Sequence, residues 1–327
     1  MPQLRQNIIT GDWVVIAPER AKRPQDFIIP PSVKVTKKEN CPFCQESEAY
    51  RKNEKIRQQV SKNIYVIQNK FPAFIENSKK PSRSFYPEEG FYRARPAIGD
   101  HEVIILKKHE LSLITMPKPL MAEMFEVIQA RYIKMKEQEG IASIMPIYNH
   151  GPEAGASIEH PHAQIFASGV VANTVGRELE GAERYFGING VCVFCDIIKH
   201  ERKVKTRLIY ENEDHIVSTF YAARFPMECW IMPKKHQSQF ENCQKKELES
   251  LADALSFIVK KMDKAIPRIP LNFFIHTLPV ALENSAYYHW HVEIVPRISN
   301  YGGYELGSGV IIDIMNPEDA AGYLKKA

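Results

Sequence analysis

The strongest constraint on the fold is that one succession of motifs occurs twice along the chain. Two Cys-x-x-Cys pairs lie about half of the 327-residue chain apart. Each pair is followed by a basic residue with Phe-Pro, a β-type run leading to a histidine, and a His-x-His segment. These matched features are Cys41/Cys44 and Cys192/Cys195, Lys70-Phe71-Pro72 and Arg224-Phe225-Pro226, His109 and His236, and His160-Pro161-His162 and His289-Trp290-His291. Four features that recur in one order indicate an internal duplication.

The hydrophobic pattern predicts the same secondary structure in both halves. Each half has a β-type run, a helix with apolar residues three or four positions apart, a short apolar strand, and a strand that carries His-x-His. The first three elements are expected at residues 103–106, 120–132 and 144–148, and again at 230–232, 248–262 and 273–275. We therefore predict an α+β fold of two similar halves, each an antiparallel sheet with packed helices.

The halves are divided near residue 170. Residues 1–170 are expected to form an N-terminal catalytic half, and residues 171–327 a C-terminal half that has degenerated. The stretch from Gly169 to Gly190 mixes charged residues with glycine and is expected to be a linker. Two units agree with the chain length, at roughly 150 residues per domain.

Composition excludes several classes of protein. The formal net charge is only +4, and the basic runs are short and scattered, so no nucleic-acid partner is expected. No apolar run reaches the roughly 18–20 residues needed to cross a bilayer, so no membrane partner is expected. The N-terminus lacks the apolar stretch of a signal peptide, which predicts a cytoplasmic protein.

The cysteine pairs predict two metal sites. Thiolate and imidazole ligands in a set of four suit zinc, and a full set of four protein ligands is typical of a structural ion. We expect one or two structural zinc ions per chain; a redox or plain buried thiol pair is the alternative. The predicted ligands are Cys41, Cys44, His109 and His160 in the first half and Cys192, Cys195, His236 and His289 in the second.

His162 is the candidate catalytic residue. Alternate residues of a strand share a face, so His160, His162 and Gln164 are expected to line one side. The preceding loop contains Gly151, Gly155 and Ser157, and such loops offer backbone N–H groups and a hydroxyl to phosphate oxygens. A neutral imidazole beside a phosphate cradle can attack phosphorus and form a phosphoramidate. A third metal ligand or a buried core histidine is the alternative for His162.

The second half lacks the matching chemistry. His291 stands where the first half has His162, but Glu293 replaces Gln164, and a carboxylate would repel a phosphate. The Gly/Ser loop is also missing, since residues 282–288 take its place. We expect one catalytic half and one degenerate half in which His291 is structural.

Several longer segments carry a resemblance to a known family. They are Asp12-Trp13-Val14-Val15, Arg20-Ala21-Lys22-Arg23-Pro24, Cys41-Pro42-Phe43-Cys44, Asn69-Lys70-Phe71-Pro72, residues 149–164, His289-Trp290-His291 and Gly303-Tyr304-Glu305. Through them the chain resembles, nearly end to end, the galactose-1-phosphate uridylyltransferase family, a branch of the histidine-triad superfamily. The resemblance implies that both halves are histidine-triad-like.

The resemblance also implies a double displacement. The histidine matching His162 would attack the α-phosphorus of a nucleoside diphosphate sugar, form a nucleotidyl-histidine and release sugar 1-phosphate, and a second sugar 1-phosphate would then take the nucleotide. Family members are commonly homodimers whose sites are completed by the partner chain. By resemblance, Arg23, Asn69 and Asn149 would contact the nucleotide, Ser157 and Gln164 its phosphates, and Tyr304 and Glu305 the hexose.

The sequence defines the substrate less closely than it defines the type of reaction. The segment 298–310 lacks the lysine and glutamine found around Gly-Tyr-Glu in the best-known uridylyltransferases, and it looks more like the branch that includes ADP-glucose phosphorylase. The favoured function is UDP-glucose:hexose-1-phosphate (galactose-1-phosphate) uridylyltransferase. The alternative is ADP-glucose phosphorylase or a related phosphorylase that passes AMP to phosphate. A zinc-bearing binding module without catalysis is a third interpretation.

Overall fold

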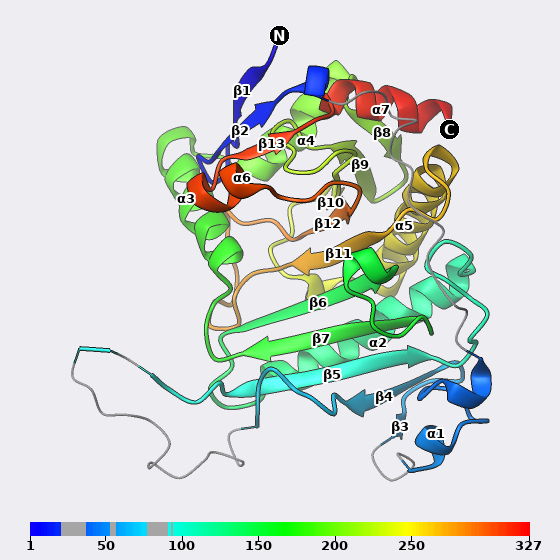
Figure 1. Ribbon diagram of the computed structural model, residues 1–327. Coiled ribbons are helices and arrows are strands. Elements are labelled where there is room, and N and C mark those ends of the chain that lie inside the picture. The colour runs from blue at the N-terminus through cyan, green and yellow to red at the C-terminus, as the bar shows by residue number, and fades with distance from the viewer. Residues whose placement is uncertain (21–36, 53–56, 77–90, 93) are drawn as a thin grey trace.

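The two predicted halves share one sheet. The computed structural model describes residues 1–20, 37–52, 57–76, 91–92 and 94–327, and within them a ten-stranded sheet runs in the order β3-β4-β5-β7-β6-β11-β12-β10-β9-β8 (Figure 1). The strands are β3 (Gln58–Gln59), β4 (Ile64–Gln68), β5 (Gly99–Leu106), β6 (Ser143–His150), β7 (His162–Ser168), β8 (Leu208–Glu211), β9 (His215–Thr219), β10 (Cys229–Pro233), β11 (Leu271–His276) and β12 (His291–Pro296). Read outwards from the centre, β6, β7, β5, β4 and β3 match β11, β12, β10, β9 and β8.

This symmetry confirms the α+β fold class and the antiparallel sheet in each half. The structure also shows how the two halves join, which the sequence did not predict. Strands β6 and β11 pair antiparallel at the centre, with Asn149 opposite Asn272 and Ile147 opposite Phe274. Each strand would otherwise be an edge with unpaired backbone groups, which is the physical reason for the union. The catalytic half and the second half therefore meet along a shared ladder of hydrogen bonds.

Two long helices build the main core behind the sheet. The helices α2 (Lys118–Lys136) and α5 (Lys245–Ala265) contain the predicted stretches and pack against one another (Figure 1). Their apolar side chains recur every three or four residues, so each helix turns one stripe inward. Phe125, Leu255 and Phe273 are fully buried in this core. The core fixes which sheet face is apolar and leaves the other face for the polar side chains of the site.

The second half is covered on that other face as well. The helices α3 (Asn173–Asn189) and α4 (Val193–Val204) enclose a second core that contains Phe194, Trp230 and Tyr288. The prediction of a linker at residues 169–190 is therefore wrong. Val175, Glu178 and Ala182 lie at helical spacing and are buried.

The chain ends also pack on the second half. Strands β1 (Gln3–Gln6) and β2 (Trp13–Ile16) form a small sheet with β13 (Ile311–Asp313). A Cβ on Gly181 of α3 would stand 1.8 Å from the carbonyl oxygen of Ile9, so only glycine allows this close approach. The remaining α-helices are α1 (Glu48–Lys52), α6 (Gly303–Ser308) and α7 (Pro317–Lys326). None of the helices in the described part of the chain has both the length and the apolar character needed to cross a membrane.

Candidate functional site

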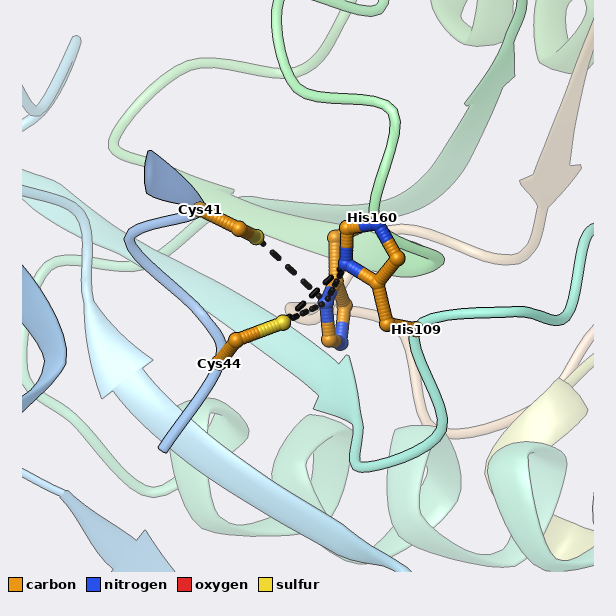
Figure 2. A group of neighbouring side chains, drawn as sticks. All are labelled: Cys41, Cys44, His109 and His160. Carbon is orange, nitrogen blue, oxygen red and sulfur yellow. Dashed lines mark hydrogen bonds between the residues drawn. The ribbon is translucent and has the colours of Figure 1, made fainter. Parts of the chain in front are cut away.

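The first cysteine pair meets two histidines, as the sequence predicted. Figure 2 shows Cys41, Cys44, His109 and His160 converging from separate segments of the chain. The Sγ atom of Cys44 lies 3.0 Å from Nδ1 of His109 and 3.4 Å from Nδ1 of His160. The Sγ atom of Cys41 lies 3.5 Å from Nδ1 of His160, and the two Nδ1 atoms lie 3.1 Å apart. All four ligand atoms lie within 4.8 Å of one another, so the group could hold a metal ion.

These distances match the shape of a tetrahedral site. Bond lengths of about 2.3 Å to sulfur and about 2.0 Å to nitrogen give tetrahedral edges of about 3.3 Å between nitrogens and about 3.5 Å between nitrogen and sulfur. The Nε2 proton of His160 is donated to the carbonyl oxygen of Leu106, so its Nδ1 atom carries a lone pair. Burial lowers the pKa of His160 to about 4 and keeps the ring neutral. The donor set therefore suits a cation.

The second half repeats this arrangement with Cys192, Cys195, His236 and His289. The Sγ atom of Cys195 lies 3.4 Å from Nδ1 of His236 and 3.7 Å from Nδ1 of His289. Here both rings donate Nε2–H to backbone carbonyls, His236 to Ser285 and His289 to Pro233, each over 2.9 Å. The pair opens a helix, because Cys192 is the N-cap of α4, but it follows α3 rather than a strand.

His162 is held as a neutral imidazole with one fixed proton. Its Nδ1–H donates to the carbonyl oxygen of His160 over 2.8 Å, which leaves the lone pair on Nε2. Burial lowers the pKa of His162, and the hydrogen bond to His160 offsets this only in part. The ring packs edge-on against Phe43, with centroids 5.4 Å apart. This geometry gives His162 the state that a nitrogen nucleophile needs near neutral pH.

One detail of the predicted strand is wrong. Strand β7 begins at His162, so His160 lies before the strand and not on the same strand face as His162 and Gln164. Pro161 has no N–H to give to a ladder, which accounts for the late start. His162 and Gln164 do share a face, while Ala163 and Ile165 point into the core behind the sheet.

On the sheet face that carries His162 and Gln164, the structure adds a histidine that no sequence motif indicated. His101 on β5 stacks on Phe166 with ring centroids 3.8 Å apart. Its Nδ1 receives the N–H of Ala73 at 3.4 Å, which places the ring proton on Nε2. With this tautomer Nε2–H is donated to Oε1 of Gln164 over 2.9 Å. The NH₂ group of Asn69, whose Nδ2 lies 3.1 Å from Nε2, then has no acceptor on this ring. Burial lowers the pKa of His101, with the Gln164 contact opposing it.

The loop before His162 needs glycine at two positions, and it has fewer free donors than expected. Gly151 and Gly155 have φ angles of +86° and +84°, which side chains other than glycine rarely adopt. The N–H groups of Ala154, Gly155 and Ala156 donate to carbonyls within the loop. Those three N–H groups are therefore not available to a phosphate. Ser157 lies exposed at the end of this turn.

In the second half, buried side chains occupy the region around His291, which corresponds to the region around His162. Four buried side chains that could also surround a metal ion meet there: Glu178, His276, His291 and Glu293. His291 donates Nδ1–H to the carbonyl oxygen of His289 over 3.1 Å, as His162 does to His160. Glu178 from α3 contacts Nδ1 of His276 at 3.0 Å. Helix α3, where the sequence predicted a linker, thus supplies a carboxylate to this cluster.

An arginine neutralises the cluster. Arg224 pairs with Glu293 and, at 2.9 Å, with Glu228. Burial alone would raise the pKa of Glu293, but the charges of Arg224 and His276 lower it well below its usual range. Burial would lower the pKa of His276, yet Glu178 and Glu293 raise it. The side chain of Glu293 is about 1% exposed, so no phosphate has access to it.

The other predicted site residues are distributed unevenly. Gln164 lies on β7 with His162, and Asn149 lies on the adjoining strand β6. Asn69 directly follows β4 and contacts His101, and Arg23 lies outside the described residues. Tyr304 and Glu305 lie on α6, which packs beside β13 and stands well apart from the start of β7 in Figure 1. One chain therefore does not bring α6 to His162.

Comparisons with known proteins agree along the whole chain. Residues 1–172 match the family profile "Galactose-1-phosphate uridyl transferase, N-terminal domain", and residues 178–306 match the corresponding C-terminal domain. An ADP-glucose phosphorylase of Arabidopsis thaliana is 32% identical over 99% of this chain and 93% of its own length. A galactose-1-phosphate uridylyltransferase of Thermotoga maritima is 26% identical over 100% of this chain and 98% of its own.

A solved structure supports the same conclusion. The crystal structure of an ADP-glucose phosphorylase from Arabidopsis thaliana with bound ADP-glucose has a TM-score of 0.83 and 30% identity, covering 100% of this chain and 99% of the other. The fold and site thus define a nucleotidyltransferase built from two histidine-triad-like halves. The chain belongs to the galactose-1-phosphate uridylyltransferase family.

Proposed function

We propose that His162 is the nucleophile of a ping-pong nucleotidyl transfer from a nucleoside diphosphate hexose. The observation that carries this proposal is the hydrogen bond from Nδ1–H of His162 to the carbonyl of His160. It fixes the proton on the nitrogen away from the substrate and leaves the Nε2 lone pair for attack. It also stabilises the positive charge that the ring gains when Nε2 bonds to phosphorus.

The reaction balances without an outside reactant. The Nε2 lone pair of His162 forms a bond to the α-phosphorus, and the bond from that phosphorus to the bridging oxygen breaks. The electron pair leaves on the phosphate oxygen of hexose 1-phosphate. In the second step, an oxygen of the acceptor phosphate attacks the same phosphorus and the electron pair returns to Nε2. The favoured acceptor is galactose 1-phosphate, with UDP-glucose as donor.

The remaining predicted residues keep their roles within this proposal. Asn69, Asn149 and Arg23 would contact the nucleotide, and Ser157 and Gln164 its phosphates. Tyr304 and Glu305 would contact the hexose in the site of a partner chain, since α6 lies away from His162 in its own chain. The proposal thus includes a homodimer in which each site is shared.

Zinc is the proposed occupant of both Cys/His groups. Cys41, Cys44, His109 and His160 would hold one ion, and Cys192, Cys195, His236 and His289 the other. With four protein ligands, zinc would tie each cysteine turn to the sheet and would not touch substrate. The six cysteines form no disulfide, which supports a reducing compartment such as the cytoplasm. We also keep the division into residues 1–170 and 171–327, with catalysis in the first half.

A second candidate is ADP-glucose phosphorylase, in which AMP passes from His162 to inorganic phosphate and ADP is released. The specific observation in its favour is the identity of 32% to an ADP-glucose phosphorylase, against 26% to the Thermotoga uridylyltransferase. Both candidates use the same nucleophile and the same covalent bond. They differ in the base and in the acceptor.

The test is covalent labelling. The protein is incubated with UDP-glucose or ADP-glucose that carries ³²P at the α-position, and acid-labile, base-stable label on the chain is counted. Label from UDP-glucose that galactose 1-phosphate removes supports the uridylyltransferase. Label from ADP-glucose that phosphate removes supports the phosphorylase. Label that persists in the His162→Ala variant, or label from neither sugar, would overturn the proposal.

A further inference from the structure

Asn272 on β11, in the second half, contacts the candidate site directly. Its Nδ2 group donates to Oδ1 of Asn149 over 2.7 Å and to the carbonyl oxygen of Ala154 over 2.8 Å. Asn149 is one of the side chains proposed to contact the nucleotide, and Ala154 belongs to the loop before His162. One amide from the half without a nucleophile therefore holds two parts of the catalytic half.

The orientation of the Asn272 amide is fixed from both ends. The carbonyl of Ala154 can only accept a hydrogen bond, so Asn272 must present its NH₂ group there. The guanidinium of Arg297 can only donate, and its Nη1 atom lies 3.5 Å from Oδ1 of Asn272. Both neighbours require the same orientation, so the amide cannot flip without losing both contacts.

The orientation of Asn149 follows from that of Asn272. Because Asn272 donates to Oδ1 of Asn149, the NH₂ group of Asn149 points the other way and is left as a donor. Tyr148 pairs with Ala163, so the next residues along, Asn149 and His162, lie side by side on the open face of the sheet. Asn149 and Asn272 also line a cavity of 330 Å³ on this face. The donor of Asn149 is thus available to an acceptor oxygen of a ligand beside His162.

We propose that Asn272 is a positioning residue for nucleotidyl transfer, acting through Asn149 and the 151–157 loop. This inference rests on the proposed function, because it assumes that Asn149 donates to the nucleotide. Hydrogen bonds in such a chain, from Arg297 through Asn272 to Asn149, strengthen one another. The catalytic half consequently depends on its degenerate partner for the alignment of a ligand-binding amide.

The test uses the isosteric variant Asn272→Asp. A carboxylate cannot donate to Asn149 or Ala154, so it repels both oxygens and releases the Asn149 amide. In single-turnover labelling with α-³²P-labelled UDP-glucose or ADP-glucose, whichever labels the wild type, we expect the rate to fall about tenfold to hundredfold. An Asn149→Ala/Asn272→Asp double variant should react at about the rate of Asn149→Ala alone. That non-additivity is absent when a substitution acts only through stability.

Asn212→Asp is the matched control. Asn212 lies in the same half, and its Nδ2 also donates to two acceptors, the carbonyl of Ser250 at 2.8 Å and Oδ2 of Asp253 at 3.2 Å. The Asn212→Asp substitution should lower the melting temperature of the protein, while the labelling rate of the folded enzyme stays near that of the wild type. A wild-type rate for Asn272→Asp, or multiplicative losses in the double variant, would overturn the inference. Failure of the wild type to label would instead overturn the proposed function.

Discussion

The backbone carbonyl of His160 holds the Nδ1 proton of His162 over 2.8 Å, while the imidazole of His160 faces the thiols of Cys41 and Cys44. One residue therefore belongs to the candidate metal group and also fixes the tautomer of the candidate nucleophile. The second half keeps the same relationship between His289 and His291, but there the ring of His291 faces the carboxylate of Glu293.

Loss of the first metal should reduce catalysis, and loss of the second should not. Cys44→Ser removes a ligand of the group that contains His160, so we expect metal content to fall from about two ions to about one per chain. The His162 labelling rate should fall at least about tenfold, because His160 is no longer held in place. Cys195→Ser should give the same metal loss with a labelling rate within about twofold of wild type. Mass spectrometry of the metal and labelling of each variant check this, and equal effects on labelling would contradict it.

On the acid side, the labelling rate should fall only at a pH below the ordinary pKa of histidine, which is near 6.5. We call this acid-side fall of the rate the acid limb. Attack requires neutral His162, and burial lowers its pKa in the folded protein. Protonation of the folded enzyme therefore begins at lower pH than in an exposed histidine, and activity persists as the pH falls through 6.5. Single-turnover labelling across the pH range, on enzyme whose fold is checked at each pH, measures this limb. A limb above pH 6.5 would contradict the assignment of His162 as a buried neutral nucleophile.

His101 should affect the rate although it does not touch the reacting atoms. Its Nε2–H donates to Oε1 of Gln164, which turns the NH₂ group of Gln164 away from His101 and makes it available to a phosphate oxygen. His101→Leu removes that restraint, and we expect labelling to slow about tenfold. His200→Leu on the exposed face of α4 is the control and should label at the wild-type rate. Equal rates for His101→Leu and wild type would show that Gln164 needs no such support.

The sequence predicted the repeated elements because each half contains its own signals. The helices at 118–136 and 245–265 and the four cysteines with their histidines follow from local periodicity and from matching motifs. The union of β6 with β11 does not follow, because it depends on two strands from different halves whose apolar patterns are independent of one another. The α3 helix was missed since its glycines suggested a linker, while Gly181 in fact allows close packing on Ile9.

The candidate site could be predicted only where residue type and spacing carry the chemistry. His162 and Gln164 lie two apart in a strand, and this spacing places them together. His101 lies on another strand, and its contact with Gln164 depends on the register of β5 against β7. Glu178 reaches His276 through the packing of a helix on the sheet. No local pattern contains these contacts, which form only when distant segments pack.

Removal of Arg224 should destabilise the second half far more than removal of an exposed arginine. The carboxylates of Glu228 and Glu293 are 0% and 1% exposed, and Arg224 pairs with both. Arg224→Ala leaves these buried charges without their partner, at a cost of about 3–5 kcal/mol in the free energy of unfolding. Arg177→Ala, whose partner Asp12 is exposed, should cost less than about 1 kcal/mol. Urea denaturation of both variants measures the difference.

A further substitution separates charge from packing. Glu293→Gln places in the second half the residue that Gln164 provides in the first, and it removes one buried negative charge. In the Arg224→Ala background it should therefore recover part of the lost stability. No recovery would mean that the guanidinium stabilises this region by packing against its neighbours. Recovery would show that the degenerate half keeps Arg224 because a carboxylate stands where the catalytic half has an amide.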